Sequence, residues 1–421
     1  MAAVVNNYLC VLAGNVLAGV LSFLISVLLS RAMTVVDFGV YSLFFAVLVL
    51  AWQIPSFIDS SYIRNARASD TDMAREYLKV GLVFKVRAAA LMAAAAPVVG
   101  WGLSRFAFAG KAGPGILAMA VGGGAFLTFL TSVMANLQVR ERFILYSLGN
   151  VSYYALLLAV LGPLSRLGPL APPAVAAVFL SAAAAAGTAA FLVLRRRAGR
   201  LAPLDRRAVS GMVAIGRWIL PAMLLFIVLQ RIDMLLAGRF FPAEMMGVYA
   251  AASRLLSILT MCVGAAVSIL LPRAAAAARS RAAERTFWRE AVFLVSAVLL
   301  AIAVLTAAAP VIVSLFYGGR FAGAGGAARL LFLGQIPYVL ALPFVYSLYG
   351  RGHTFPNFAA MAACFAVNVA ANVVLLPRLG LTGPGWAYGA GYSAYLGAIL
   401  IFFFRRRRGP GFRSRDPQRS A

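Results

Sequence analysis

Three charged residues interrupt two long apolar segments in the second half of the chain. Arg231 and Asp233 lie in the segment 218–237, and Arg254 lies in the segment 247–271. A charge near the middle of a membrane-spanning segment costs about 2.5–3.5 kcal/mol on insertion scales, so it needs a partner, a water-filled cavity or a ligand. Arginine also grips phosphate oxygens with its planar fork and stays charged at any workable pH. These three residues are therefore the first candidates for binding an anionic ligand.

The spacing of these charges leaves two interpretations open. With a rise of about 1.5 Å per residue, Arg231 and Arg254 lie at similar depths, about 9 and 10 Å inside their segments. Residues two apart on a helix point about 200° from one another, so Arg231 and Asp233 cannot face one narrow groove together. Either the arginines line a cavity and bind phosphate while Asp233 orients one of them, or the charges form a structural ion pair between helices. Because two basic residues accompany only one acidic residue, the cavity interpretation is favoured over the structural ion pair, most of all for Arg254.

A second group of charges lies in the first half, at the ends of two apolar segments. Asp59 and Arg64 close one segment, and Lys85 and Arg87 lie near the start of the next. We expect all four side chains to reach water. If they face a cavity instead, Arg64 and Lys85 would form a second basic binding site for an anionic headgroup.

Composition places the chain in the membrane. Of 421 residues 63% are hydrophobic, only 12% are charged, and the mean hydropathy is +0.90. Soluble proteins carry about 25% charged residues. The net charge of +26 is explained by basic residues collecting in cytoplasmic loops, so no nucleic-acid partner is expected. The loop charges place both termini in the cytoplasm.

Metal, cofactor and enzyme motifs are not expected. The cysteines, Cys10, Cys262 and Cys364, are far apart, and His353 is the single histidine. The glycine-rich stretches 122–124 and 318–326 lack the Lys-Ser or Lys-Thr of a phosphate-binding loop. We expect the first to allow close helix packing and the second to be a flexible loop.

Windows of about 20 apolar residues predict twelve membrane spans. They run approximately 8–30, 40–60, 80–103, 115–137, 146–164, 174–194, 218–237, 247–271, 291–315, 329–350, 357–377 and 384–404. The predicted fold class is an all-α polytopic membrane protein with loops too short for a folded domain.

An internal repeat relates the two halves. Arg31 precedes Gly39-Val40-Tyr41 as Arg239 precedes Gly247-Val248-Tyr249, an offset of 208 in both cases because 239 − 31 and 247 − 39 agree. Two six-helix bundles of equal orientation are the simplest explanation, related by a pseudo-two-fold axis along the membrane normal. We therefore predict bundles at 1–194 and 218–404, a basic linker at 195–217 and a basic cytoplasmic tail at 405–421.

These motifs resemble a known family. The stretch from Arg31 to Tyr41 with Asp59 and Arg64, the run from Pro221 to Pro272, and the closing run from Asn372 to Gly383 are similar to bacterial polysaccharide-biosynthesis flippases. Those are the O-antigen-type lipid-linked oligosaccharide flippases of the multidrug/oligosaccharidyl-lipid/polysaccharide exporter superfamily. The likeness covers essentially the whole chain.

The resemblance implies a V-shaped central cavity in the bacterial inner membrane and no enzymatic activity. It implies that undecaprenyl-pyrophosphate-linked repeat units cross by alternating access, with the pyrophosphate or acidic sugars held at Arg231 and Arg254. For the energy source of such transport, Asp59 and Asp233 are the candidate carriers of a coupling proton. Membrane lipids, a polysaccharide polymerase and a chain-length regulator are the other implied partners. A multidrug or small-molecule exporter of the same superfamily and a peptidoglycan lipid-precursor flippase are the alternatives.

Overall fold

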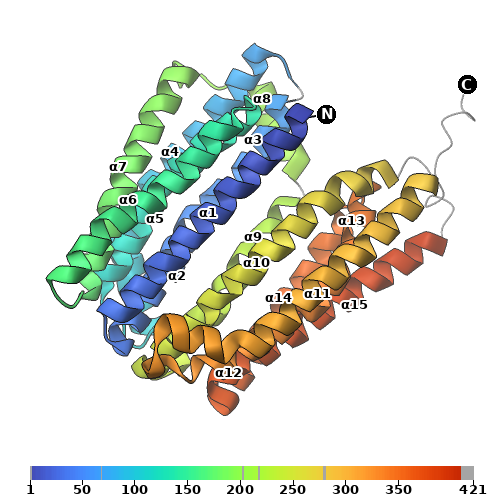
Figure 1. Cartoon of the computed structure of the whole chain (residues 1–421). Helices are drawn as coiled ribbons and strands as arrows, with labels where there is room; N and C mark the ends of the chain where they lie inside the picture. Colours follow the sequence, from blue (N-terminus) through green and yellow to red (C-terminus); the bar gives the residue numbers. More distant parts are fainter. Residues whose placement is uncertain (1, 68, 202, 217–218, 278–280, 409–421) are drawn as a thin grey trace, which may run out of the picture. The chain divides into compact units, whose positions relative to one another are not determined.

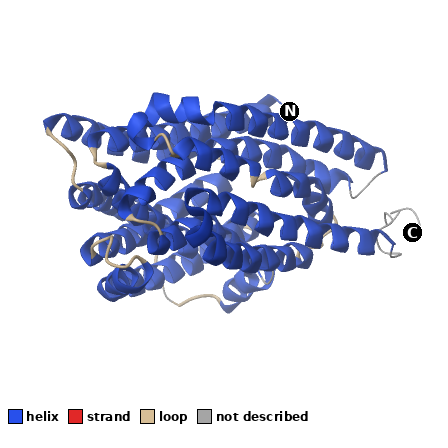
Figure 2. Cartoon of the chain, turned by 90° about the horizontal axis from the view of Figure 1, so that it is seen from below, coloured by secondary structure: helices blue, strands red, loops and turns tan. Residues whose placement is uncertain are grey.

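The described part of the chain is helical throughout. The computed structural model describes residues 2–67, 69–201, 203–216, 219–277 and 281–408 (Figure 1), and no strand occurs among them (Figure 2). Eleven apolar stretches within these residues are long enough to cross a membrane. The last, Phe355–Arg406, contains two helices in succession, so the prediction of about twelve spans in an all-α membrane protein is confirmed.

The helices follow one another along the chain with short connections. The first part contains α1 (Ala2–Ala32), α2 (Val35–Ser56), α3 (Ile58–Arg67), α4 (Thr71–Gly102), α5 (Pro114–Val139), α6 (Phe143–Leu167), α7 (Pro172–Ala198), α8 (Arg206–Gly216) and α9 (Ile219–Phe240). It is followed by α10 (Ala243–Ala277), α11 (Arg281–Tyr317), α12 (Ala324–Leu333), α13 (Ile336–Gly350), α14 (Phe355–Leu379) and α15 (Gly383–Arg408).

The chain divides into two compact units, 1–250 and 251–421, with the boundary inside α10. In the first unit α5 packs against α2, α4, α6 and α7, and α2 also packs against α9. In the second unit α15 packs against α12, α13 and α14. The predicted bundles at 1–194 and 218–404 stay a prediction. Residues 217 and 218 and most of the predicted tail, 409–421, lie outside the described residues.

Of the two glycine-rich stretches, 122–124 has the structure expected from the sequence and 318–326 does not. A Cβ atom on Gly124 of α5 would collide with Ala51 of α2, which confirms the expected close packing because only glycine lets these backbones approach. The stretch 318–326 is a short 3-10 helix, Gly319–Phe321, followed by the start of α12, and Phe321 is fully buried. This stretch was expected to be a loop, and part of it is helical instead, with Phe321 packed inside the protein.

The repeated motifs begin two helices that touch one another. Thr34 caps α2 by accepting a hydrogen bond from the Asp37 backbone N–H at 3.1 Å, and Glu244 occupies the first turn of α10. An acid in the first turn favours a helix start because it faces the positive end of the helix dipole. A Cβ on Gly39 would lie 2.9 Å from the backbone nitrogen of Gly247. The repeated glycines therefore mark a close approach of α2 and α10.

Adding one methyl group at this contact should destabilise the protein. In Gly247→Ala the new Cβ would overlap the Val35 carbonyl, and such overpacking costs about 1–3 kcal/mol. We expect a lower unfolding temperature for the purified protein in detergent. Gly81→Ala is the matched control, because a Cβ there meets nothing within 4 Å. Equal unfolding temperatures for the two variants would contradict the close approach.

Candidate functional site

A buried ion pair lies inside the first unit, between α3 and α4. The Lys85 ammonium is 2.6 Å from an Asp59 carboxylate oxygen, and the exposed fractions of the two side chains are 0% and 15%. Lys85 also donates to the Thr128 carbonyl at 2.8 Å and to the Thr131 hydroxyl at 2.9 Å. An ammonium group has three donors, and each of them has an acceptor here.

Hydroxyl groups of α5 and α2 complete the surroundings of this pair. Ser132 donates to the other Asp59 carboxylate oxygen at 3.3 Å, and the Ser56 hydroxyl lies 2.7 Å from that of Thr131. Such networks matter because a buried charge without partners is costly. Four helices thus contribute to one polar cluster, which we call the Lys85 cluster: Ser56, Asp59, Lys85, Thr128, Thr131 and Ser132.

The Lys85 cluster corrects the expectation that Asp59, Arg64, Lys85 and Arg87 all reach water. Arg64 and Arg87 are exposed, but Lys85 is fully buried and neutralised by Asp59. The signal for this pairing was present in the sequence, since isolated opposite charges in neighbouring apolar segments tend to pair. The register that places one helix against the other, and the hydroxyls of α5, could not be read from it.

Arg231 and Asp233 contact different parts of the first unit. The Arg231 guanidinium carbon lies 5.7 Å from the centre of the Phe45 ring on α2, a cation–π distance. Asp233 is buried and accepts a hydrogen bond from the Tyr249 hydroxyl of the repeated motif. These two contacts lie on different helices, α2 for Arg231 and α10 for Asp233, as expected for residues about 200° apart on a helix.

The end of α9 is fixed by a residue that the sequence interpretation missed. Lys111 donates to the backbone carbonyls of Gly238 at 2.8 Å and Arg239 at 3.1 Å, which suits the negative end of a helix dipole. Burial, and then the charge of Arg239, lower the pKa of Lys111. The lysine links the loop before α5 to the helix that carries Arg231 and Asp233.

Arg254 lies in α10, within the second unit, and its side chain is partly buried. Its carbonyl accepts a hydrogen bond from the Ser257 hydroxyl at 2.6 Å. The predicted grouping of Arg231, Asp233 and Arg254 stays a prediction, because Arg254 belongs to a different unit from the other two.

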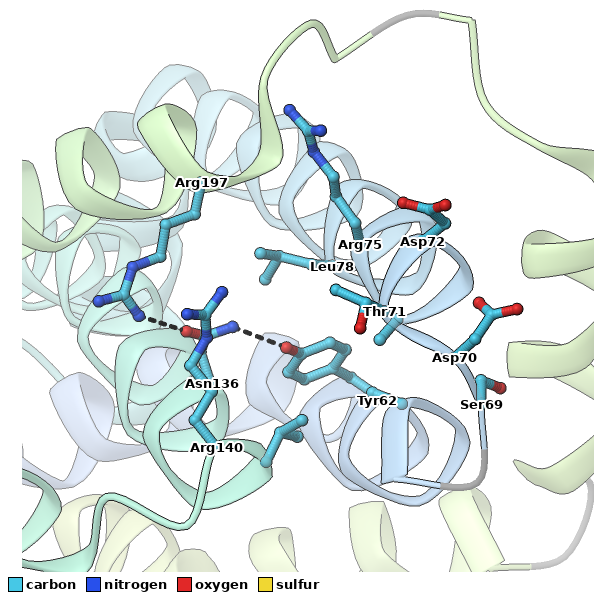
Figure 3. A pocket seen from close by; sticks show the side chains of 13 residues that line it. Tyr62, Ser69, Asp70, Thr71, Asp72, Arg75, Leu78, Asn136, Arg140 and Arg197 are labelled. Atoms are coloured by element: carbon cyan, nitrogen blue, oxygen red, sulfur yellow. Dashed lines mark hydrogen bonds between the residues drawn. The ribbon is translucent and has the colours of Figure 1, made fainter.

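A hydrogen-bonded chain of three side chains lies at the end of the first unit (Figure 3). Arg197 of α7 donates to the Asn136 amide oxygen at 2.6 Å, and the Asn136 amide nitrogen donates to the Tyr62 hydroxyl at 2.7 Å. Asn136 and Tyr62 are buried. Tyr62 is one turn from Asp59 on α3, and Asn136 is one turn from Ser132 on α5. This chain is therefore adjacent to the Lys85 cluster along both helices.

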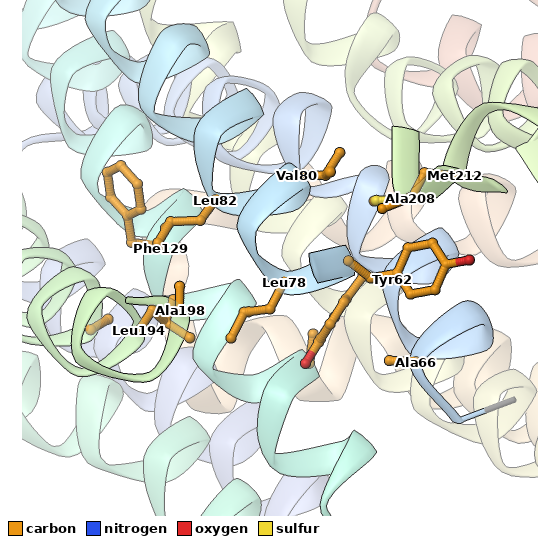
Figure 4. Close-up of a cluster of buried hydrophobic side chains, with 13 residues drawn as sticks. Tyr62, Ala66, Leu78, Val80, Leu82, Phe129, Leu194, Ala198, Ala208 and Met212 are labelled. Carbon is orange, nitrogen blue, oxygen red and sulfur yellow. The ribbon is translucent and has the colours of Figure 1, made fainter. Parts of the chain in front are cut away.

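An apolar cluster holds the same helix ends together (Figure 4). Tyr62, Leu78, Leu194 and Met212 come from α3, α4, α7 and α8 and are all buried. The amphipathic helix α8 therefore docks onto this end of the unit through its apolar face. Among the described residues, no group of three His, Cys, Asp or Glu side chains is placed to hold a metal ion.

Comparison with known structures defines the fold. An inward-facing multidrug transporter of the MATE family, in the MOP superfamily, is similar with a TM-score of 0.72 at 14% identity, covering 92% of this chain and 94% of that one. The lipid II flippase MurJ, in an inward closed conformation, has a TM-score of 0.66 at 13% identity, covering 95% and 88%. The chain thus has the fold of MOP superfamily transporters.

A model of the polysaccharide biosynthesis protein family matches residues 28–324. The chain therefore belongs to this family, as the sequence motifs suggested, and is a multi-pass membrane protein. The comparison with curated proteins found no match. A MOP superfamily transporter from Pyrococcus furiosus Vc1, described as having a binding pocket of reverse polarity, is also similar, with a TM-score of 0.60 at 14% identity over 96% of this chain and 95% of that one.

Proposed function

We propose that this protein is a flippase that moves polyprenyl-pyrophosphate-linked oligosaccharides across the bacterial inner membrane for surface polysaccharide synthesis. The family match over residues 28–324 carries the proposal, and the fold of transporters and of a lipid II flippase supports it. Undecaprenyl pyrophosphate is the proposed carrier. No bond is broken in this task, which agrees with a non-enzymatic role.

The charges at membrane depth fit an anionic cargo. Lys85 is neutralised by Asp59, and Asp233 is held by Tyr249. Arg231 lies over an aromatic ring, which keeps its charge and restricts its position. We propose Arg231 and Arg254 as the residues that bind the pyrophosphate, with Asp233 and Tyr249 holding α9 and α10 together at the level of Arg231.

The Lys85 cluster is the proposed place of ion coupling. A proton on Asp59 would remove the negative charge opposite Lys85 and leave a buried ammonium without its counter-ion, which is an unfavourable state. Protonation would therefore favour a rearrangement of α3 against α4 and α5. We propose Asp59 as the first coupling residue, Asp233 as the second, and exposed Arg64 as a contact for headgroups arriving from the cytoplasm.

We also propose an orientation of the protein in the membrane. The basic residues of the loops put both termini in the cytoplasm, where the lipid-linked units would be made. A polysaccharide polymerase and a chain-length regulator would then act on the delivered units at the other side of the membrane.

Deleting the gene in its native host tests this function. We expect loss of one surface polysaccharide and accumulation of its lipid-linked repeat unit facing the cytoplasm, both restored by the wild-type gene. An unchanged set of surface polysaccharides, together with new sensitivity to a cationic drug, would favour a multidrug exporter instead. Accumulation of the peptidoglycan lipid precursor would favour a peptidoglycan-precursor flippase.

A further inference from the structure

A pocket of about 430 Å³, lined by both charged and apolar side chains, opens at the end of the first unit, where the start of α4 meets the ends of α3, α5 and α7. Arg231 and Arg254 are not among its lining residues, whereas Arg75, Arg140 and Arg197 are. Pockets for small ligands have volumes of about 300–1,000 Å³, so its size suits a headgroup of one sugar and one phosphate. It lies wholly within one compact unit.

One wall of this pocket is basic and firmly positioned. Arg197 and Arg140 lie on the same side as Asn136 (Figure 3). Asn136 is 2% exposed, and its amide is fixed between Arg197 and Tyr62. This hydrogen bond uses one of the five N–H donors of the Arg197 guanidinium. The wall thus presents two guanidinium groups from two helices, which is suitable for phosphate oxygens.

Oxygen-bearing side chains from the start of α4 and the turn before it line the opposite wall. Asp70, Asp72, Ser69 and Thr71 line it, and Figure 3 shows both carboxylates away from Arg140 and Arg197. Asp70 is fixed because one of its oxygens accepts the Met73 backbone N–H at 2.8 Å. Carboxylate and hydroxyl oxygens accept hydrogen bonds from the hydroxyl groups of a sugar.

Arg75 links the two walls. Its guanidinium donates to the Ala198 carbonyl at 3.3 Å, so the first turn of α4 is joined to the end of α7. Gly199 follows α7 with a φ of +73° and lies against the Arg75 guanidinium, and this backbone conformation favours glycine. The hydrogen bond from Arg75 connects the helix that starts at the oxygen-lined wall to the helix that carries Arg197.

We infer that this pocket binds the phosphate-bearing sugar of a glycosylated carrier lipid before it enters the transport path. Arg140 and Arg197 bind the phosphate, and Asp70 and Asp72 accept hydrogen bonds from the sugar hydroxyls. The opposite charges of the two walls carry this assignment, because a phosphate alone would gain nothing from the two carboxylates. The identification of the lipid as cargo rests on the proposed function, whereas recognition of a sugar phosphate does not.

Calorimetric titration of the full-length protein, in nanodiscs of a zwitterionic lipid, tests the pocket without any transport step. Glucose 1-phosphate is the probe, with inorganic phosphate and glucose as single-group controls. We expect the sugar phosphate to bind at least about tenfold more tightly than either control, because both walls are then engaged. Arg140→Gln, a change at an exposed side chain, should weaken binding by about tenfold or more, and Arg197→Gln should do the same.

Matched variants separate the two walls. Arg196→Gln alters the neighbouring exposed arginine of α7, which does not line the pocket, and it should leave binding unchanged. Asp72→Asn should weaken the binding of glucose 1-phosphate but not the binding of inorganic phosphate.

Three results would overturn the inference. The first is equal affinity for phosphate and glucose 1-phosphate, and the second is equal loss of binding in Arg196→Gln and Arg140→Gln. The third is complete loss of glucose 1-phosphate binding when the protein is placed in nanodiscs of phosphatidylglycerol. This result would assign the pocket to an ordinary anionic lipid. A protein that binds glucose 1-phosphate but moves no lipid would retain this site and lose only the proposed function.

Discussion

Arg254→Ala is expected to reach the membrane in normal amount and to lose most of its transport of lipid-linked oligosaccharide. A charge-assisted hydrogen bond to a phosphate contributes about 1.5–3 kcal/mol, so removing the guanidinium should reduce transport by about tenfold to a hundredfold. Arg254→Lys should recover only part of this loss, because lysine keeps the charge but lacks the planar fork. Surface polysaccharide and the amount of protein in isolated membranes are the measurements.

The matched control for Arg254 is Arg378→Ala in the same unit. Arg378 is exposed at the end of α14, and its loss should leave transport unchanged. Normal surface polysaccharide in Arg254→Ala would show that Arg254 does not bind the transported lipid. Equal defects in both variants would show a general sensitivity to lost positive charge rather than a role of Arg254.

The second large effect is expected at the Lys85 cluster. Asp59→Leu or Lys85→Met alone leaves one buried charge without its counter-ion, which costs about 3–5 kcal/mol. Each single variant should therefore unfold at a clearly lower temperature than the wild type. The double variant removes both charges and should recover much of that stability, because apolar residues can replace a buried pair.

The double variant also tests ion coupling. If Asp59 carries the coupling proton, the double variant should be folded and inactive in the polysaccharide assay. A stable and fully active double variant would show that the Asp59–Lys85 pair has only a structural role. Single variants as stable as the wild type would contradict the buried ion pair itself.

The membrane fold was predictable because hydropathy is a strong and local signal. Spans of about 20 apolar residues need no knowledge of their neighbours, and the repeated Gly-Val-Tyr motif located two equivalent helix starts. The short helices α3 and α8 were not predicted, because polar and basic residues interrupt them. Their burial depends on Tyr62 and Met212 packing against other helices, which no local pattern reveals.

The candidate site was predictable only in part. Isolated charges such as Asp59, Lys85, Arg231 and Asp233 stand out against apolar sequence, so they could be found. Their partners could not, because Thr131, Phe45 and Tyr249 are ordinary membrane residues until the helices are packed. The pocket at Arg140 and Arg197 was hidden for another reason. Basic residues at helix ends are expected in any membrane protein, and only the fixed amide of Asn136 distinguishes this group.

Reconstitution tests the flippase proposal most directly. The purified protein would be placed in liposomes that carry a fluorescent polyprenyl-pyrophosphate-linked oligosaccharide, and the fraction of label accessible to an impermeant quencher would be followed with time. We predict that the wild type and Arg378→Ala equilibrate the label between leaflets and that Arg254→Ala does so about tenfold to a hundredfold more slowly. Label that moves no faster than in protein-free liposomes, while a cationic drug is transported by the same preparation, would contradict the proposal.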